Sequence, residues 1–202
     1  MNESALTRDD ILEAAEEVLR RFGPAKATVV DVARALGVSH GSVYRHFPSK
    51  AALRDAVTER WLARIAAPLA VIAEEDGPAP ERLHRWLDTL ITSKQSRALD
   101  DPELFATYVT LANEARDVVR AHVNTLVEQL AQIIADGIAQ GELTPADPTV
   151  TARALFNATA RFHDPAHAAR WSEPGSRQAF EAVWCLLLAG LTAPRTPPTS
   201  AS

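Results

Sequence analysis

The chain has 202 residues, of which 47% are hydrophobic and 23% are charged, and these proportions exclude a collagen-like fibre, a disulfide-stapled scaffold and a largely disordered protein. Its 21 basic and 26 acidic residues give a formal net charge of −5, so a cationic surface over the whole protein is excluded as well. The excess charge is uneven, because residues 1–50 hold seven residues of each sign and residues 51–202 carry the whole negative balance.

Alanine supplies 37 residues and alternating apolar patterns are scarce, so the sequence predicts an all-α protein. The first helix should begin after Thr7, whose hydroxyl can cap it, and should stop at the Gly-Pro pair that starts at Gly23. A second, short helix begins after Thr28 and ends at Gly37, where glycine permits a tight turn.

A third short helix should begin after Ser39 and end before Pro48, because a residue that precedes proline disfavours the helical conformation. A fourth helix, capped by Ser49, is expected over about 50–73, and it connects the first segment to the rest of the chain. Pro68 lies within this range and is expected to kink or end the helix.

Beyond a Gly- and Pro-containing loop at 74–80 the helices lengthen. Apolar residues at helical spacing place them at about 83–91, 102–112, 116–140, 148–160 and 177–191. The last of these contains the single cysteine, Cys185, in an apolar run, which predicts a small core residue rather than a reactive thiol. Residues 194–202 have the composition of a disordered tail.

The longest apolar runs, 65–73 and 183–191, are about half as long as a membrane-spanning helix. The N-terminal segment shows no basic start followed by an apolar stretch, so no secretory signal is expected. With only one cysteine and no possible disulfide framework, the chain is expected to be cytoplasmic and to stay out of the membrane.

The segment from Thr28 to Lys50 carries the most informative pattern. Two short helices joined by a glycine turn have the form of a helix-turn-helix, whose second helix enters the major groove of DNA. The residues at the start of that helix are small or polar, which lets its backbone approach phosphates and base edges closely. Val43 and Phe47 lie four residues apart and should anchor the helix inward, which leaves Tyr44 and its neighbours facing outward.

About a quarter of the chain, from Ile11 to Val57, resembles the DNA-binding domain of the TetR family of transcriptional regulators. The residues that match this family in order and spacing are Gly37, Val38, Ser39, Gly41, Ser42, Val43, Tyr44, His46, Phe47 and Lys50. Residues 24–27 depart from the pattern, because many relatives carry a second glycine there, and this alters a loop but not the motif.

The resemblance implies a set of residues that face DNA. They are Thr28, Ser39, His40, Gly41, Ser42, Tyr44, Arg45, His46 and Lys50. Of these, His40, Ser42 and Arg45 would lie closest to bases, and the others, Gly41 apart, would contact phosphates. Two alternatives stay open, since Thr28 and Ser39 would cap helices in any helical protein and Arg45 could bind phosphate instead of guanine.

The resemblance also implies a larger helical domain that binds a small effector and forms a homodimer. The expected division is 1–50 for the helix-turn-helix domain and 51–193 for the second domain, with the dimer interface on its last two helices. Those helices are rich in small and apolar residues, which would also suit the domain's own core.

Candidate residues for an effector pocket are Trp86, Leu90, Phe105, Tyr108, Val109, Asn113, Phe156, Asn157 and His163. Aromatic residues at helical spacing are more often core than pocket, so the same residues could simply pack the interior. A mostly apolar cavity with few polar groups would suit a hydrophobic or aromatic compound.

No pattern in the sequence indicates an enzyme, a metal site or a cofactor. His163 and His167 have a spacing that could ligate a metal on a helix, but Pro165 interrupts that helix. The acidic groups at 74–76 and 100–101 lie beside prolines or glycines and indicate solvated turns or caps rather than an acid–base pair.

The sequence therefore predicts a homodimeric transcriptional regulator whose partners are a double-stranded DNA operator and a small, mostly apolar effector. A repressor that the effector releases from a palindromic operator is the first interpretation. A transcriptional activator, a ligand-independent regulator and an all-helical enzyme that uses the C-terminal cavity are the alternatives.

Overall fold

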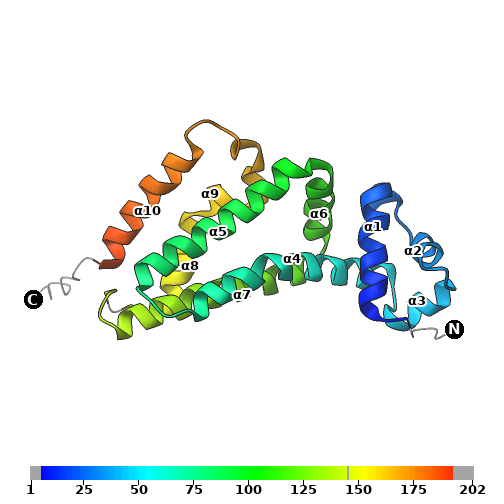
Figure 1. Cartoon of the computed structure of the whole chain (residues 1–202), viewed down its shortest axis with the longest axis horizontal. Coiled ribbons are helices and arrows are strands. Elements are labelled where there is room, and N and C mark those ends of the chain that lie inside the picture. Colours follow the sequence, from blue (N-terminus) through cyan, green and yellow to red (C-terminus); the bar gives the residue numbers. More distant parts are fainter. Residues whose placement is uncertain (1–5, 145, 193–202) are drawn as a thin grey trace, which may run out of the picture. The chain divides into compact units, whose positions relative to one another are not determined.

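The structure is a computed structural model, and it describes residues 6–144 and 146–192 (Figure 1). Over these ranges it contains helices and no strand, which confirms the all-α prediction. The chain forms two compact units: the first contains the residues up to 64 and residues 97–122, and the second contains residues 65–96 and those from 123 onward. The functional division after residue 50 stays a prediction, and the expected tail at 194–202 lies outside the described residues.

The first unit opens with three helices, α1 (Arg8–Lys26), α2 (Val29–Leu36) and α3 (His40–His46). Both α1 and α2 begin with a capping box, in which the threonine hydroxyl accepts the N–H of an aspartate three residues on and the aspartate accepts the threonine N–H. Gly23, with φ of 72°, breaks the regular helix where the sequence predicts an end, and a further turn follows to Lys26.

The first unit also contains the beginning of α4 (Lys50–Glu74), the end of α5 (Ala79–Asp100), α6 (Pro102–Glu114) and the beginning of α7 (Arg116–Ala139). Of the two outcomes expected at Pro68, a kink or an end, the end is wrong, because α4 continues through Pro68 to Glu74. Pro68 is exposed, so water can satisfy the carbonyl group that loses its partner where proline lacks an N–H.

The core of the helical head formed by α1, α2 and α3 is closed by side chains from all three helices and from α4. Ile11, Val43 and Val57 have no exposed surface, and Phe47 is 2% exposed. The prediction that Val43 and Phe47 anchor α3 inward is therefore confirmed. Burial of such residues is the main stabilising contribution to a small helical unit.

The second unit contains the remaining parts of α4, α5 and α7, followed by α8 (Pro148–Ala158), α9 (Ala160–His163), a 3-10 helix (Pro165–Arg170) and α10 (Ser176–Thr192). Trp86, Leu90, Leu130 and Phe180 lie in its core. The helix predicted over 148–160 is divided at Thr159, whose hydroxyl donates back to the carbonyl of Leu155 at 3.0 Å.

The prediction that Cys185 is a core residue is wrong, because Cys185 is exposed on α10. The buried side chains of this helix are Phe180 and Trp184, which are four residues apart and share one face. Cys185 follows Trp184 by one residue, about 100° around the helix, and so leaves that face. An apolar run alone does not show which of its sides is buried.

Among the described helices, none is long and apolar enough to cross a membrane.

Candidate nucleic-acid interface

A glycine in the left-handed conformation joins α2 to α3. Gly37 has φ of 67° and ψ of 26°, and its N–H donates to the carbonyl of Arg34 at 3.2 Å. The N–H of Val38 donates to the carbonyl of Ala33 at 3.0 Å, so two of the carbonyls in the last turn of α2 are satisfied. Because residues with a side chain rarely adopt this conformation, glycine allows α3 to start immediately after a sharp turn.

Ser39, Ser42 and Arg45 form a chain of hydrogen bonds along the first turns of α3. Ser39 Oγ accepts the N–H of Ser42 at 3.2 Å and lies 2.9 Å from the Ser42 hydroxyl. Arg45 Nη2 donates to Ser42 Oγ at 3.2 Å. The structure thus brings together three of the residues predicted to face DNA, and Ser39 acts as the N-cap that the sequence predicts.

The outer face of α3 carries His40 and Tyr44, whose rings meet edge to face with centroids 6.3 Å apart. Tyr44 is 43% exposed, whereas Val43 and Phe47 of the same segment are buried. Arg45 and Lys50 are exposed, and His46 is half-buried. No acidic residue occurs between residues 32 and 50, so this face is cationic although the protein is acidic overall.

Gly41 lies on the exposed side of α3 and is not required for packing. A Cβ added there would have Ser39 Oγ at 3.7 Å as its nearest neighbour, which is an ordinary contact. The position is helical and its φ is not positive, so the fold itself would accept a side chain. A glycine at this place instead leaves room for a molecule outside the chain to approach the backbone.

The side chain and the N–H of Thr28 both take part in the capping box of α2. Its hydroxyl donates to Asp31 Oδ2 at 2.6 Å, and its N–H donates to the same oxygen at 3.2 Å. The side-chain hydrogen bond from Thr28 is the main reason why the pKa of Asp31 is lowered, so this carboxylate is charged at neutral pH. Arg34 Nη1 pairs with Asp31 at 3.0 Å and offsets the negative charge next to Thr28.

Sequence reasoning missed Arg8, which fixes the end of α3. Arg8 Nη1 donates to the carbonyl of His46 at 2.9 Å, and its guanidinium lies 4.2 Å from the centre of the Phe47 ring. This cation–π contact and hydrogen bond tie the first turn of α1 to the last turn of α3. No local signal could have revealed the contact, because the two partners are 38 residues apart in the chain.

The residues predicted to line an effector pocket do not form one group within a single unit. The first unit contains Phe105, Tyr108, Val109 and Asn113, and the second contains Trp86, Leu90, Phe156, Asn157 and His163. Trp86 and Leu90 have no exposed surface, whereas Asn113 and Asn157 are exposed. Each residue's role as a ligand contact stays a prediction.

His163 has the environment of a core histidine. It is 1% exposed, and its Nε2 lies 3.2 Å from both the carbonyl oxygen of Phe156 and the hydroxyl of Thr159. Burial lowers the pKa of His163 to about 4, and the nearby charge of Lys94 adds to this effect, so the ring is neutral at physiological pH. Among the described residues, no group of three or more histidine, cysteine or acidic side chains could hold a metal.

Two family models match the chain over most of its length. The model of bacterial regulatory proteins of the tetR family matches residues 11–57, and the model of the tetracyclin repressor-like C-terminal domain matches residues 79–184. A helix-turn-helix-type transcriptional regulator of Mycobacterium tuberculosis is 31% identical over 149 residues, which cover 73% of this chain and 68% of that protein.

Two solved structures share the fold. One is SmeT, the repressor of the Stenotrophomonas maltophilia multidrug efflux pump SmeDEF, with a TM-score of 0.67 and 20% identity over 98% of this chain and 96% of that chain. The other is the transcriptional regulator FadR from Bacillus subtilis in complex with stearoyl-CoA, with a TM-score of 0.62 and 18% identity over 92% and 100% of the two chains. At these identities the likeness establishes the common architecture.

Proposed function

The chain belongs to the TetR family of transcriptional regulators, and from that premise we propose that it is a homodimeric repressor which a small effector releases from a palindromic operator. The observation that carries the proposal is the outer face of α3, where His40, Tyr44 and Arg45 are exposed beside a glycine that packing does not require. Helix-turn-helix proteins place such a helix in the major groove of DNA.

Within this proposal the DNA-facing residues divide into two roles. The residues that contact phosphates are Thr28, Ser39, Tyr44, His46 and Lys50. His40 and Arg45 approach base edges, where a guanidinium can pair with O6 and N7 of guanine. Gly41 allows the backbone of α3 to come close to the duplex.

The apolar surface of α10 supports a homodimer. Leu186 is 77% exposed, and Cys185 is exposed beside it. On α8, Val150 is 67% exposed. Contiguous exposed apolar patches mark protein–protein contacts, and we propose that these side chains belong to one. In the proposed complex these helices pair with their symmetry mates, and a palindromic operator requires the two copies of α3 to lie about 34 to 36 Å apart, which is one turn of DNA.

The fold offers precedents for repression and for ligand binding. SmeT is a repressor, and the FadR structure contains stearoyl-CoA, a ligand with a large apolar part. We propose a small and mostly apolar effector for this protein as well. Such a ligand acts only if it binds more tightly to the form that has left DNA, because equal affinity for both forms shifts no equilibrium.

The test is fluorescence anisotropy of the full-length protein on labelled DNA from upstream of its own coding region, at about 50 and about 200 mM salt. We expect selective binding that weakens steeply as salt rises. Lys50→Ala should weaken binding by a similar factor on specific and unrelated DNA, whereas Arg45→Ala should also reduce the preference for the specific fragment.

Arg120→Ala is the matched control, because Arg120 is an exposed arginine of α7 whose side chain pairs with Asp117 at 2.7 Å. Its affinity for DNA should equal that of the unmodified protein. Equal affinities of Arg45→Ala and Arg120→Ala would show that α3 is not the reading helix. A reporter gene placed behind the same DNA fragment separates repression from activation by the sign of its response.

A further inference from the structure

The first unit contains a cavity of about 220 Å³ that the proposed DNA contacts do not use. Its walls come from α1, α4, the end of α5 and α6, and no residue of α2 or α3 lines it. The volume corresponds to about seven molecules of liquid water at about 30 Å³ each, which is enough for a compound with one ring.

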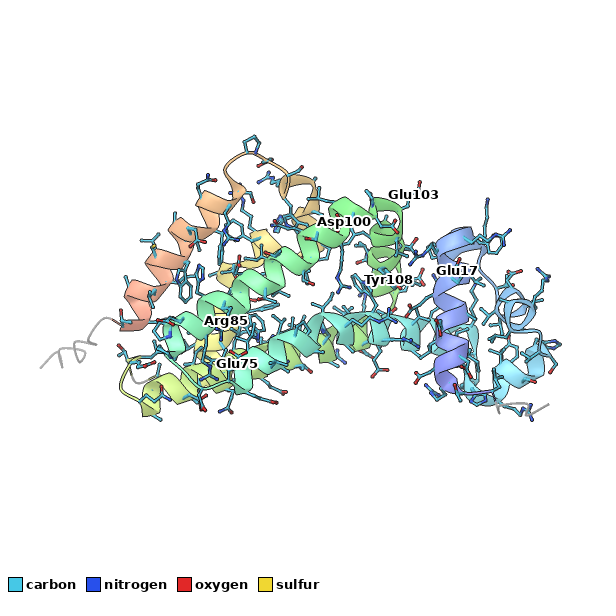
Figure 2. The ribbon with its side chains drawn as sticks, viewed as in Figure 1. Glu17, Glu75, Arg85, Asp100, Glu103 and Tyr108 are labelled. Carbon is cyan, nitrogen blue, oxygen red and sulfur yellow. The ribbon has the colours of Figure 1, made fainter. Side chains whose placement is uncertain are left out.

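Aromatic side chains form the apolar wall of the cavity. The rings of Trp61 on α4 and Tyr108 on α6 are stacked, with centroids 4.5 Å apart and an angle of 3° between their planes. Phe105, one turn before Tyr108, also lines the cavity. Figure 2 shows Tyr108 on α6, and burial raises the pKa of its hydroxyl to about 12, so that it remains a neutral hydrogen-bond donor.

Two of the three carboxylates at the cavity already have partners. Glu16 is held by Arg64, with Nη1 at 2.9 Å, and by Arg60, with Nε at 3.4 Å. Asp101 caps α6 by accepting the N–H of Leu104 at 3.0 Å. Asp100 is the third, and it lies exposed at the end of α5 (Figure 2).

Two of the three arginines at the cavity lack such partners. Neither Arg20 nor Arg97 forms an ion pair or hydrogen bond with another of the described residues, whereas Arg64 is paired with Glu16. Burial is the main reason why the pKa of Arg97 is lowered, and the nearby charge of Arg64 adds to this effect while Tyr108 opposes it. A guanidinium in this situation gains from an external anion, which it can bind through two parallel hydrogen bonds.

We infer that this cavity binds a small organic carboxylate with a flat apolar body, whose carboxylate lies between Arg97 and Arg20 and whose body packs on Trp61, Phe105 and Tyr108. The inference adds a negative charge to the proposed effector, and only its regulatory consequence rests on the proposed function. Because Glu16 and Arg20 belong to α1, an occupant would touch the helix that holds α3 through Arg8.

Isothermal titration calorimetry of the full-length protein with benzoate, benzamide and inorganic phosphate tests the site. We expect benzoate to bind at least about tenfold more tightly than benzamide, which has the same shape without the charge, and than phosphate, which has no apolar body. Arg97→Gln should weaken benzoate binding by about tenfold or more, and the exposed Arg20→Gln should weaken it several-fold.

Arg120→Gln, which removes an exposed arginine of the same unit away from the cavity, should leave benzoate binding unchanged. The circular dichroism spectrum of each variant shows whether it is folded. If Arg97→Gln does not fold, Arg20→Gln still tests the site. Equal binding of benzoate and benzamide, benzoate binding unaffected by both substitutions, or no heat at millimolar benzoate would each overturn the inference.

DNA binding by the same preparations without benzoate separates this inference from the proposed function. If the protein binds DNA but not benzoate, the carboxylate site alone is refuted. If it binds benzoate but not DNA, the assignment of the reading helix alone is refuted. If benzoate changes the affinity for DNA of the unmodified protein but not of Arg97→Gln, the cavity is a regulatory site. Binding of benzoate with no change in DNA affinity would refute that regulatory role.

Discussion

Replacement of Gly41 by alanine should separate the docking role of α3 from its folding role. Gly41 is the second residue of α3, and an added Cβ meets no atom closer than Ser39 Oγ at 3.7 Å. Alanine is favoured over glycine by about 1 kcal/mol in a helix interior and by roughly half of that in a first turn. We therefore expect the free energy of unfolding, measured by urea denaturation, to stay constant or to rise by about 0.5 kcal/mol.

The affinity of Gly41→Ala for DNA should fall in spite of this stability. The new methyl group projects from the exposed start of α3, where the backbone approaches the duplex in the proposed complex. A displaced contact to a phosphate costs about 1.5 to 3 kcal/mol, which corresponds to a roughly ten- to hundredfold higher dissociation constant. Anisotropy titration of the specific fragment measures this change.

Gly137→Ala provides the opposite case. A Cβ at Gly137 would lie 2.5 Å from Ala79 Cβ and 2.8 Å from Leu143 Cδ1, so this variant should lose stability by about 1 to 3 kcal/mol through overpacking. Its remaining folded fraction should bind DNA normally. If Gly41→Ala lost stability as Gly137→Ala does, or bound DNA as tightly as the unmodified protein, the reasoning about Gly41 would be refuted.

Three further substitutions test other contacts. Arg8→Ala removes the hydrogen bond to His46 and the cation–π contact with Phe47, so it should lower the unfolding free energy by about 1 kcal/mol and weaken DNA binding on all sequences; unchanged binding would contradict a positioning role. The pKa of His163 is lowered from 6.5 to about 4 in the folded protein, so the unfolded chain binds more protons in this range and the free energy of unfolding should fall as the pH drops from about 6.5 to about 4. In urea titrations His163→Gln should reduce this dependence of the unfolding free energy on pH, and an unchanged dependence would contradict the assignment of His163 as a neutral core histidine. Leu186→Glu places a charge on the exposed face of α10 and should convert the dimer to a folded monomer in sedimentation velocity experiments, whereas an unchanged mass would exclude this face as the interface.

The head could be predicted almost completely because its signals are local. Thr7, Thr28 and Ser39 cap the helices through atoms three residues away, and Gly37 turns the chain by its own backbone conformation. Each of these effects depends on a few neighbouring residues, so the spacing of residue types is sufficient to predict it.

The features that could not be predicted depend on neighbours that are distant in the chain or on the orientation of a face. Pro68 remains inside α4 because its side of the helix is exposed, and Cys185 is exposed because Phe180 and Trp184 face the core. Arg8 contacts α3 only after the helices have packed. For the same reason the two guanidinium groups without ion-pair partners at the cavity could not be predicted, since Arg20 and Arg97 come together only in the folded unit.

The hydrogen bonds of Ser42 bear on whether Arg45 binds guanine or phosphate. The hydroxyl of Ser42 already has two partners within α3, Ser39 Oγ at 2.9 Å and Arg45 Nη2 at 3.2 Å, so it has little capacity left to read a base. Arg45 uses one N–H for this contact and keeps the others of its guanidinium available. Ser42 lies in the first turn of α3, so its hydrogen bond holds the Arg45 guanidinium near the N-terminal end of the helix. Recognition helices present that end to base edges. We therefore propose that Arg45 pairs with guanine rather than with phosphate and that Ser42 positions its guanidinium.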